Sequence, residues 1–436
     1  MDTFEAEPIE TDEDQPSLAA EGGFRAPFPR TEMHPKEALE RLRNGELIEK
    51  VRIVGLRFRG EFPHPVRFRN VLLVQPIVEK AAFAEDVSFE HCTIDRLQFN
   101  RTSTFEKGLN LSASTLIKAS LRRLTVRGVF RCDNLRTRGR LLVEGARFEG
   151  RVRFWEAHFQ GWVEFKQCEF VEEADFRSSQ AEEGFVLTGC HFRSNALFRG
   201  ATVQKKWQAD TSRFDGVLDL SKAKLHDFVY LEGIEQGKGQ TFAFTNALAE
   251  RILIRSDQLA GRLASENAGD HAQAMQEYGL LKRAFEGLHR YEQEDWAFYM
   301  FKVNQRRGKA RSWRNPWTKL GGLADWLLLD HGCGYGTKPL RAVRAALVII
   351  LGFALIYAIG IDSLNVEHPP FAGPKQGLGN RLMIGTLTSV SSFTSGFGDI
   401  RDAAQGWMNL PLIAESLLGT LLWGLFIVAF SRKVIR

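Results

Sequence analysis

Large apolar residues recur along the middle of the chain at steps that alternate between six and five residues. The phenylalanines that begin this series are Phe148, Phe154, Phe159, Phe165, Phe170 and Phe176. The same steps lead on, with mostly apolar residues, as far as Leu231. A period of eleven residues that persists for so long predicts a β-solenoid, in which equivalent side chains of successive coils stack on one another.

Small residues accompany this series, two places before every second large position. They are Ala146, Ala157, Cys168, Ser179, Cys190, Ala201, Ser212 and Ala223. Such triplets suit a narrow solenoid, because adjacent inward side chains must share a thin core. The two cysteines of the series are therefore interpreted as core residues.

The small-x-large repeat resembles the pentapeptide-repeat family of right-handed β-helices, whose five-residue motif has a large apolar centre and a small residue two places before it. The resemblance implies a right-handed solenoid over residues 51–236. Between Val51 and Gly139 the rhythm survives only in pieces, at Phe83, Phe89, Ile94, Phe105, Leu111 and Leu116.

A helical connector is expected over residues 240–336. Apolar residues between Ala272 and Val303 recur at spacings of three and four residues, which predicts an amphipathic helix. This helix is expected to cap the solenoid or to contact another subunit. The following stretch, Lys302–Arg344, combines basic residues with tryptophan. Its place before an apolar segment favours anionic lipid headgroups over nucleic acid, with an interfacial helix at Trp317–Leu329 and a turn at Gly332–Gly336.

Two apolar segments predict an all-α membrane domain over residues 340–436. Ala345–Ile361 and Leu410–Phe430 are long enough to cross or nearly cross a bilayer. Basic residues precede the first and follow the second, so both termini are expected in the cytoplasm and the protein in the cell (inner) membrane. Between them, Asn380–Ser392 is too short to span and predicts a re-entrant helix.

The stretch TSGFGD, Thr394–Asp399, directly follows this short helix. Glycines at alternate positions permit a row of carbonyl oxygens that replaces the water around a cation. The order of span, short helix, loop and span resembles the two-transmembrane potassium channels. The resemblance implies that carbonyl oxygens come from Thr394, Ser395, Gly396 and Phe397, that Gly398 forms the outer turn, and that Asp399 is the outer anchor.

The resemblance also implies a homotetramer, because four copies complete the ring. Ser395 and Phe397 replace the valine and tyrosine of the family, so cation permeation is a stronger expectation than strict selectivity for potassium over sodium. Gly419 lies near the hinge glycine of the family, and helix packing explains it equally well. Glu415 is hypothesised to support the filter from behind, against Ser391 or Thr388; the alternative is a residue lining the outer mouth.

The composition of the chain adds three expectations, which concern the N-terminus, the cysteines and the charge of the solenoid. The first 24 residues contain eight acids and no Lys or Arg, which predicts a disordered tail over residues 1–40. The five cysteines include no CxxC pair, and no catalytic constellation is visible, so neither an enzyme nor a cofactor or metal is expected beyond a permeant monovalent cation. Nearly balanced charge between Arg140 and Glu232 argues against mimicry of nucleic acid.

The expected function is a tetrameric cation channel, with potassium as the permeant ion, whose cytosolic solenoid regulates the gate. The alternative is a membrane-tethered scaffold, in which the solenoid binds a partner protein and the apolar segments only anchor it.

Overall fold

The computed structural model describes residues 31–310, 321–323, 325–364, 377–395 and 406–434. The chain divides into two compact units. One contains the residues up to 269 together with 283–288, and the other contains residues 270–282 and those from 289 onward.

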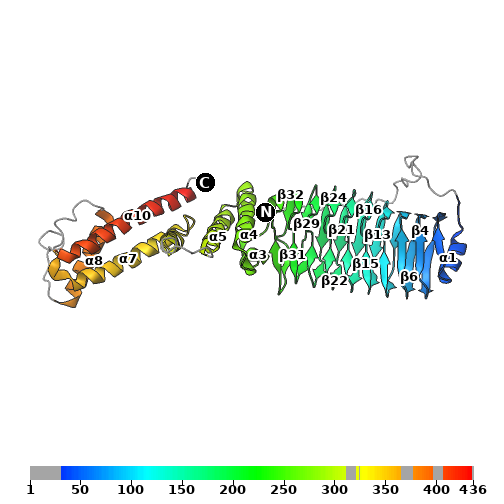
Figure 1. The fold of residues 1–436 in the computed structure, drawn as a ribbon, viewed down its shortest axis with the longest axis horizontal. Helices are drawn as coiled ribbons and strands as arrows, with labels where there is room; N and C mark the ends of the chain where they lie inside the picture. Colours follow the sequence, from blue (N-terminus) through cyan, green and yellow to red (C-terminus); the bar gives the residue numbers. More distant parts are fainter. Residues whose placement is uncertain (1–30, 311–320, 324, 365–376, 396–405, 435–436) are drawn as a thin grey trace, which may run out of the picture. The chain divides into compact units, whose positions relative to one another are not determined.

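The first unit is a parallel β-solenoid whose short strands form four rows (Figure 1). The first row is a ten-stranded sheet of β1 (Leu47–Glu49), β4 (Val66–Arg69), β7 (Val87–Glu90), β11 (Gly108–Asn110), β15 (Val129–Arg131), β19 (Val152–Arg153), β23 (Ala174–Asp175), β27 (Ala196–Leu197), β31 (Val217–Asp219) and β34 (Thr241–Ala243). The second row is β2 (Arg52–Val54), β5 (Leu72–Val74), β8 (Thr93–Asp95), β12 (Thr115–Leu116), β16 (Arg136–Thr137), β20 (His158–Phe159), β24 (Gln180–Ala181), β28 (Thr202–Val203), β32 (Lys224–Tyr230) and β35 (Leu248–Leu253).

The remaining strands form the third and fourth rows. The third row is β3 (Arg57–Phe62), β6 (Ile77–Phe83), β9 (Leu97–Phe99), β13 (Ala119–Arg122), β17 (Leu141–Glu144), β21 (Val163–Lys166), β25 (Phe185–Thr188) and β29 (Trp207–Gln208). The fourth row is β10 (Ser103–Phe105), β14 (Leu124–Val126), β18 (Arg147–Phe148), β22 (Glu169–Phe170), β26 (His191–Phe192), β30 (Arg213–Phe214) and β33 (Glu235–Gln236).

Stacked phenylalanines form the core of the solenoid. Phe148 pairs in register with Phe170, and Phe170 pairs with Phe192. Their ring centroids are 5.2 and 4.4 Å apart, and a second stack places Phe154 5.2 Å from Phe176. All five rings are at most 1% exposed. Because paired residues are 22 positions apart, the period of eleven is half a turn, and the predicted β-solenoid is confirmed.

The small-residue positions lie in the same core, as the sequence indicated. Cys168 and Cys190 are 2% and 1% exposed, and burial raises the pKa of the Cys168 thiol well above its ordinary value. Burial likewise raises the pKa of the Cys92 thiol to about 12. Thiols that stay protonated are poor nucleophiles and poor metal ligands, which favours a packing role for Cys92 and Cys168.

The N-terminal turns have variable lengths. Leu47 pairs with Arg67, 20 residues later, whereas Phe130 pairs with Val152, 22 residues later. A change in turn length interrupts a fixed repeat, which is why the sequence showed only pieces of the rhythm there. The strands of the solenoid extend over Leu47–Leu253, beyond the expected limits of 51–236 on both sides.

Short helices cover both ends of the solenoid. At the N-terminal end, α1 (Pro35–Arg43) buries Ala38 and Leu42 beside the first strands. Residues 35–40 therefore belong to the folded unit, contrary to the expected disordered tail through residue 40. Residues 1–30 lie outside the described residues.

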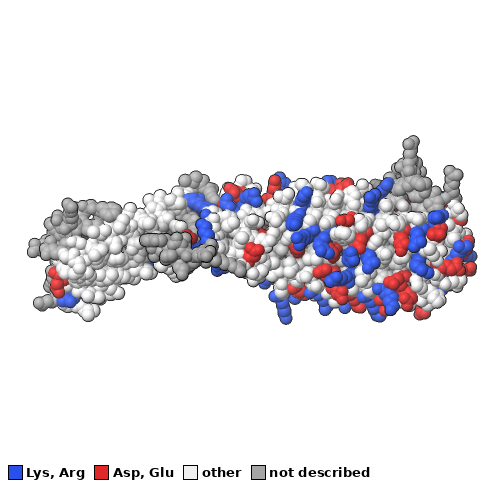
Figure 2. Space-filling view, viewed as in Figure 1, with Lys and Arg blue, Asp and Glu red and all other residues white. Residues whose placement is uncertain are grey.

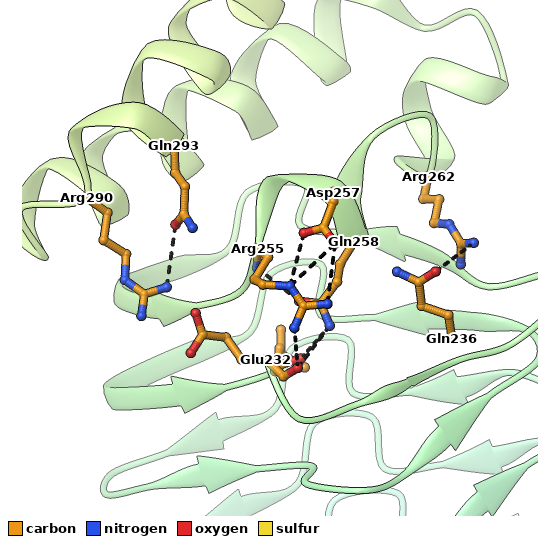
Figure 3. A network of polar contacts seen from close by, with 9 residues as sticks. Glu232, Gln236, Arg255, Asp257, Gln258, Arg262, Arg290 and Gln293 are labelled. Atoms are coloured by element: carbon orange, nitrogen blue, oxygen red, sulfur yellow. Dashed lines mark hydrogen bonds and ion pairs between the residues drawn. The ribbon is translucent and has the colours of Figure 1, made fainter. Parts of the chain in front are cut away.

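At the other end, α2 (Ser256–Leu259) and α3 (Ala264–Asn267) follow the last strand. The side chains of Gln258 and Arg255 donate to the backbone carbonyl of Glu232, at 3.1 and 3.4 Å (Figure 3). Gln258 is only 1% exposed. These donors satisfy carbonyl groups near the end of the solenoid, a polar cap that the sequence did not predict.

The connector contains two helices where one was predicted. α4 (His271–Gly287) and α5 (Tyr291–Ala310) are separated at His289, whose φ of 55° lies in the left-handed region. A left-handed residue shortly after the last turn is a common way for a helix to end.

The segment after α5 is described in part. Residues 311–320 and 324, which include five of the 13 residues of the expected interfacial helix, lie outside the described residues. Residues 321–323 are helical, and Asp325–Gly332 forms a π-helical segment, η1. The expected turn follows, with Gly334 and Tyr335 at φ of 57° and 53°.

The second unit ends in three longer helices, α7 (Pro339–Ile359), α8 (Leu378–Ser395) and α10 (Asn409–Val434), with short 3₁₀ turns η2 (Ile361–Ser363) and η3 (Gly406–Met408) between them (Figure 1). α7 and α10 are long and apolar enough to cross a membrane. They contain most of the two segments that the sequence indicated.

Candidate functional site

The predicted filter begins in the last turn of α8. Thr394 and Ser395 are helical, whereas Gly396, Phe397, Gly398 and Asp399 lie outside the described residues. The Thr394 hydroxyl donates to the Val390 carbonyl at 2.8 Å, an ordinary contact within a helix. The short helix therefore continues through residue 395 and takes in the first two residues of the expected filter.

Two glycines bring α8 into backbone contact with its neighbours. A Cβ atom added at Gly385 would lie 2.4 Å from the carbonyl oxygen of Ala354 in α7. One added at Gly419 in α10 would lie 2.4 Å from the carbonyl oxygen of Phe393 in α8. Any larger residue would force these helices apart, so both glycines have a packing role. For Gly419, this contact favours the packing explanation that the sequence left open beside the hinge.

The C-terminal end of α8 lies about half-way along the two long helices. The Ser389 hydroxyl is 2.9 Å from the carbonyl oxygen of Ile350, the twelfth of the 21 residues of α7. Phe393 contacts Gly419, the eleventh of the 26 residues of α10. Phe393 also lines an apolar cavity of about 190 Å³ together with Ala346 of α7. α8 thus enters between α7 and α10 and ends near their middle.

Glu415 joins all three helices. Its side chain is 0% exposed, and the Tyr357 hydroxyl of α7 donates to Oε2 at 2.6 Å. The Ser389 hydroxyl of α8 contacts Oε1. The Ser389 hydroxyl has one proton, so it donates to either the Ile350 carbonyl or the Glu415 side chain at one time.

Tyr357 and Ser389, which contact Glu415, were not among the partners that the sequence suggested. Thr388 instead donates its hydroxyl to the Ile384 carbonyl at 2.9 Å. Neighbouring residues on an α-helix point about 100° apart, so an error of one position selects a different face. Sequence reasoning missed Ser389 and Tyr357, and a tyrosine inside an apolar segment was the one visible signal for the latter.

Large apolar side chains remain exposed on the outer faces of these helices. They include Leu347, Val348, Leu351 and Leu355 on α7, Met383 and Leu387 on α8, and Leu417, Leu421, Trp423 and Ile427 on α10. Figure 2 shows that this part of the second unit has almost no charge, whereas both signs of charge are interspersed over the solenoid. A continuous apolar surface of this kind requires lipid or other protein around it.

Among the described residues, no group of three or more His, Cys, Asp or Glu side chains is placed to hold a metal ion. No family model matches the sequence, and neither the curated proteins nor the solved structures include a match to this chain.

Proposed function

We propose that this chain is one subunit of a homotetrameric membrane channel for monovalent cations, with potassium as the permeant ion. Conduction would use the backbone carbonyl oxygens of Thr394–Phe397, with Gly398 and Asp399 at the outer end. The observation that carries the proposal is the position of α8, which lies between two membrane-length helices and ends near their middle.

Chain length supports the proposal. If α7 and α10 cross a hydrocarbon core of about 30 Å, the end of α8 lies about 15 Å below the outer surface. Residues 396–405 then lead back to η3 and the start of α10. Ten residues can extend over about 33 Å, so the segment that contains the glycine pair is long enough to return along a central axis.

Electrostatics also favours a cation at this place. The carbonyl end of an α-helix has a partial negative charge of about half an elementary charge. α8 is 18 residues long and ends at Ser395. In the proposed arrangement, its carbonyl end would be directed toward the middle of the membrane. Four such ends around one axis would stabilise a partly dehydrated cation.

The buried contacts give the proposed filter a rigid support. Gly385 and Gly419 allow α8 to touch both neighbours, and Glu415 connects all three helices through Tyr357 and Ser389. Burial of a carboxylate in an apolar helix bundle is energetically unfavourable unless the group has hydrogen-bond partners, which favours a specific structural role for Glu415. The exposed apolar faces of α7, α8 and α10 provide the surface that lipid and three further copies would cover.

The test is cation flux through the purified full-length protein in liposomes, with potassium on one side and sodium on the other. We expect a saturable, cation-selective flux and a tetramer in lipid. Gly396→Ala should abolish the flux, because the added methyl group restricts the backbone conformations of the carbonyl row.

Gly352→Ala is the matched control, since a Cβ atom at Gly352 on α7 meets nothing within 4 Å. A wild-type protein that conducts no cation, or that is monomeric in lipid, would refute the channel. A wild-type flux that Gly396→Ala leaves unchanged would place conduction elsewhere and favour the membrane-tethered scaffold.

A further inference from the structure

Helix α5 holds the last turn of α10 through buried charges. The guanidinium of Arg432 in α10 is 3.3 Å from Glu294 Oε1 and 3.1 Å from Asp295 Oδ1. The same group lies 4.4 Å from the ring centroid of Phe298. The side chains of Glu294, Asp295 and Arg432 are 1%, 13% and 21% exposed. This set, the Arg432 cluster, is largely withdrawn from water.

The same helix also holds the first turn of α7, through Asp330. Arg306 and Tyr299 of α5 donate to the Asp330 carboxylate at 2.7 and 2.8 Å. Arg341 in α7 donates to the Asp330 backbone carbonyl at 3.0 Å and lies 3.4 Å from its carboxylate. The Asp330 side chain is 7% exposed. This set is the Asp330 cluster.

Burial gives these contacts an energetic consequence that exposed ion pairs lack. An exposed pair contributes little, because water solvates both charges when they separate. Removing one partner of a buried pair leaves the other charge uncompensated, which is strongly unfavourable. Lys282 Nζ also lies 3.7 Å from Glu294 Oε1, so departure of Arg432 would leave Glu294 with one cation and would remove the guanidinium from Asp295.

Resting on the proposed function, we propose that α5 couples the gate to the rest of the chain. The Arg432 cluster and the Asp330 cluster attach this one helix to the last turn of α10 and the first turn of α7. A displacement of α5 is then transmitted to both membrane helices, and the intact clusters favour one state of the channel. The covalent path to α5 runs from the solenoid through α4.

The first test measures the coupling without any reference to conduction. Hydrogen exchange is followed on the full-length protein in lipid nanodiscs, for wild type, Arg432→Gln and Asp295→Asn. We expect faster exchange in α5 and in the last turns of α10 for both variants. Lys433→Gln is the matched control, because it removes the same charge from the exposed neighbouring residue. Unchanged exchange in α5, or an equal effect of Lys433→Gln, would overturn the proposal.

The second test measures gating in single-channel recordings. We expect Arg432→Gln and Asp295→Asn each to change the ratio of open to closed times about tenfold, equivalent to about 1.4 kcal/mol. In the double variant the two effects should be non-additive by threefold or more, because the residues share one network. Asp330→Asn should shift the same ratio through α7.

The two proposals fail in different ways. A wild-type protein without flux refutes the channel, and the exchange measurement still decides whether α5 holds both membrane helices. If the wild type conducts and the cluster variants keep the wild-type ratio of open to closed times, the coupling is refuted and the channel is not. The same holds if the effects of Arg432→Gln and Asp295→Asn on this ratio are strictly additive. If Arg432→Gln fails to fold, Asp295→Asn, which preserves side-chain size, decides the outcome by itself.

Discussion

Replacement of Gly419 by alanine tests the central packing contact of the proposed pore. The added Cβ atom would lie 2.4 Å from the carbonyl oxygen, 3.1 Å from the carbonyl carbon and 3.2 Å from the Cα atom of Phe393. All three are backbone atoms, so no side-chain rotation relieves the clash. Because Phe393 directly precedes Thr394, the displacement reaches the first residue of the proposed filter.

The size of the effect follows from this geometry. A comfortable contact with a backbone atom needs about 3.5 Å, so α8 and α10 must separate locally by about 1 Å. Overpacking of this kind typically costs about 1–3 kcal/mol. The intrinsic gain of alanine over glycine in a helix, about 1 kcal/mol, offsets only part of a cost at the upper end of that range.

Gly424→Ala on the same helix is the matched comparison. A Cβ atom there meets nothing within 4 Å, so the change keeps the propensity gain without the clash. Thermal unfolding in detergent and cation flux in liposomes are measured for both variants. We expect Gly419→Ala to lower the unfolding temperature and the flux, and Gly424→Ala to leave both unchanged or to raise stability. Equal behaviour of the two variants would refute the close contact of α8 with α10.

Three further predictions concern single contacts. Glu415→Gln should keep more cation flux than the double variant Tyr357→Phe/Glu415→Ala. The glutamine amide can donate to the Ser389 hydroxyl and still accept from Tyr357, whereas the double variant removes both contacts. Equal flux through the two variants would contradict this expectation. Phe170→Ala should destabilise the solenoid by about 3–5 kcal/mol in chemical denaturation, and Trp155→Ala, at a site 41% exposed, should have little effect. The hydrogen bond from His191 holds the pKa of Asp215 below its ordinary value, so the pair stabilises the fold above the unfolded carboxyl pKa of about 4 and loses this contribution as the pH falls. Asp215→Asn should therefore cost less than about 1 kcal/mol at neutral pH, and the difference should vanish in acid.

The solenoid and the two membrane-length helices could be predicted from the amino-acid sequence alone. Each turn of the solenoid stacks on the one before it, so a local period in the sequence translates directly into rows such as Phe148, Phe170 and Phe192. Likewise, a long apolar segment needs only its own composition to be recognised. Both signals are local, and no knowledge of distant neighbours is required to detect them.

The contacts between residues of different helices could be identified only in the folded chain. Tyr357, Ser389 and Glu415 come from three helices, and the one-position error between Thr388 and Ser389 is a difference of about 100° around α8. The attachment of Arg432 to Glu294 likewise joins residues 138 positions apart. Such pairings depend on how helices cross and rotate against each other, and a pattern along one chain does not contain that information.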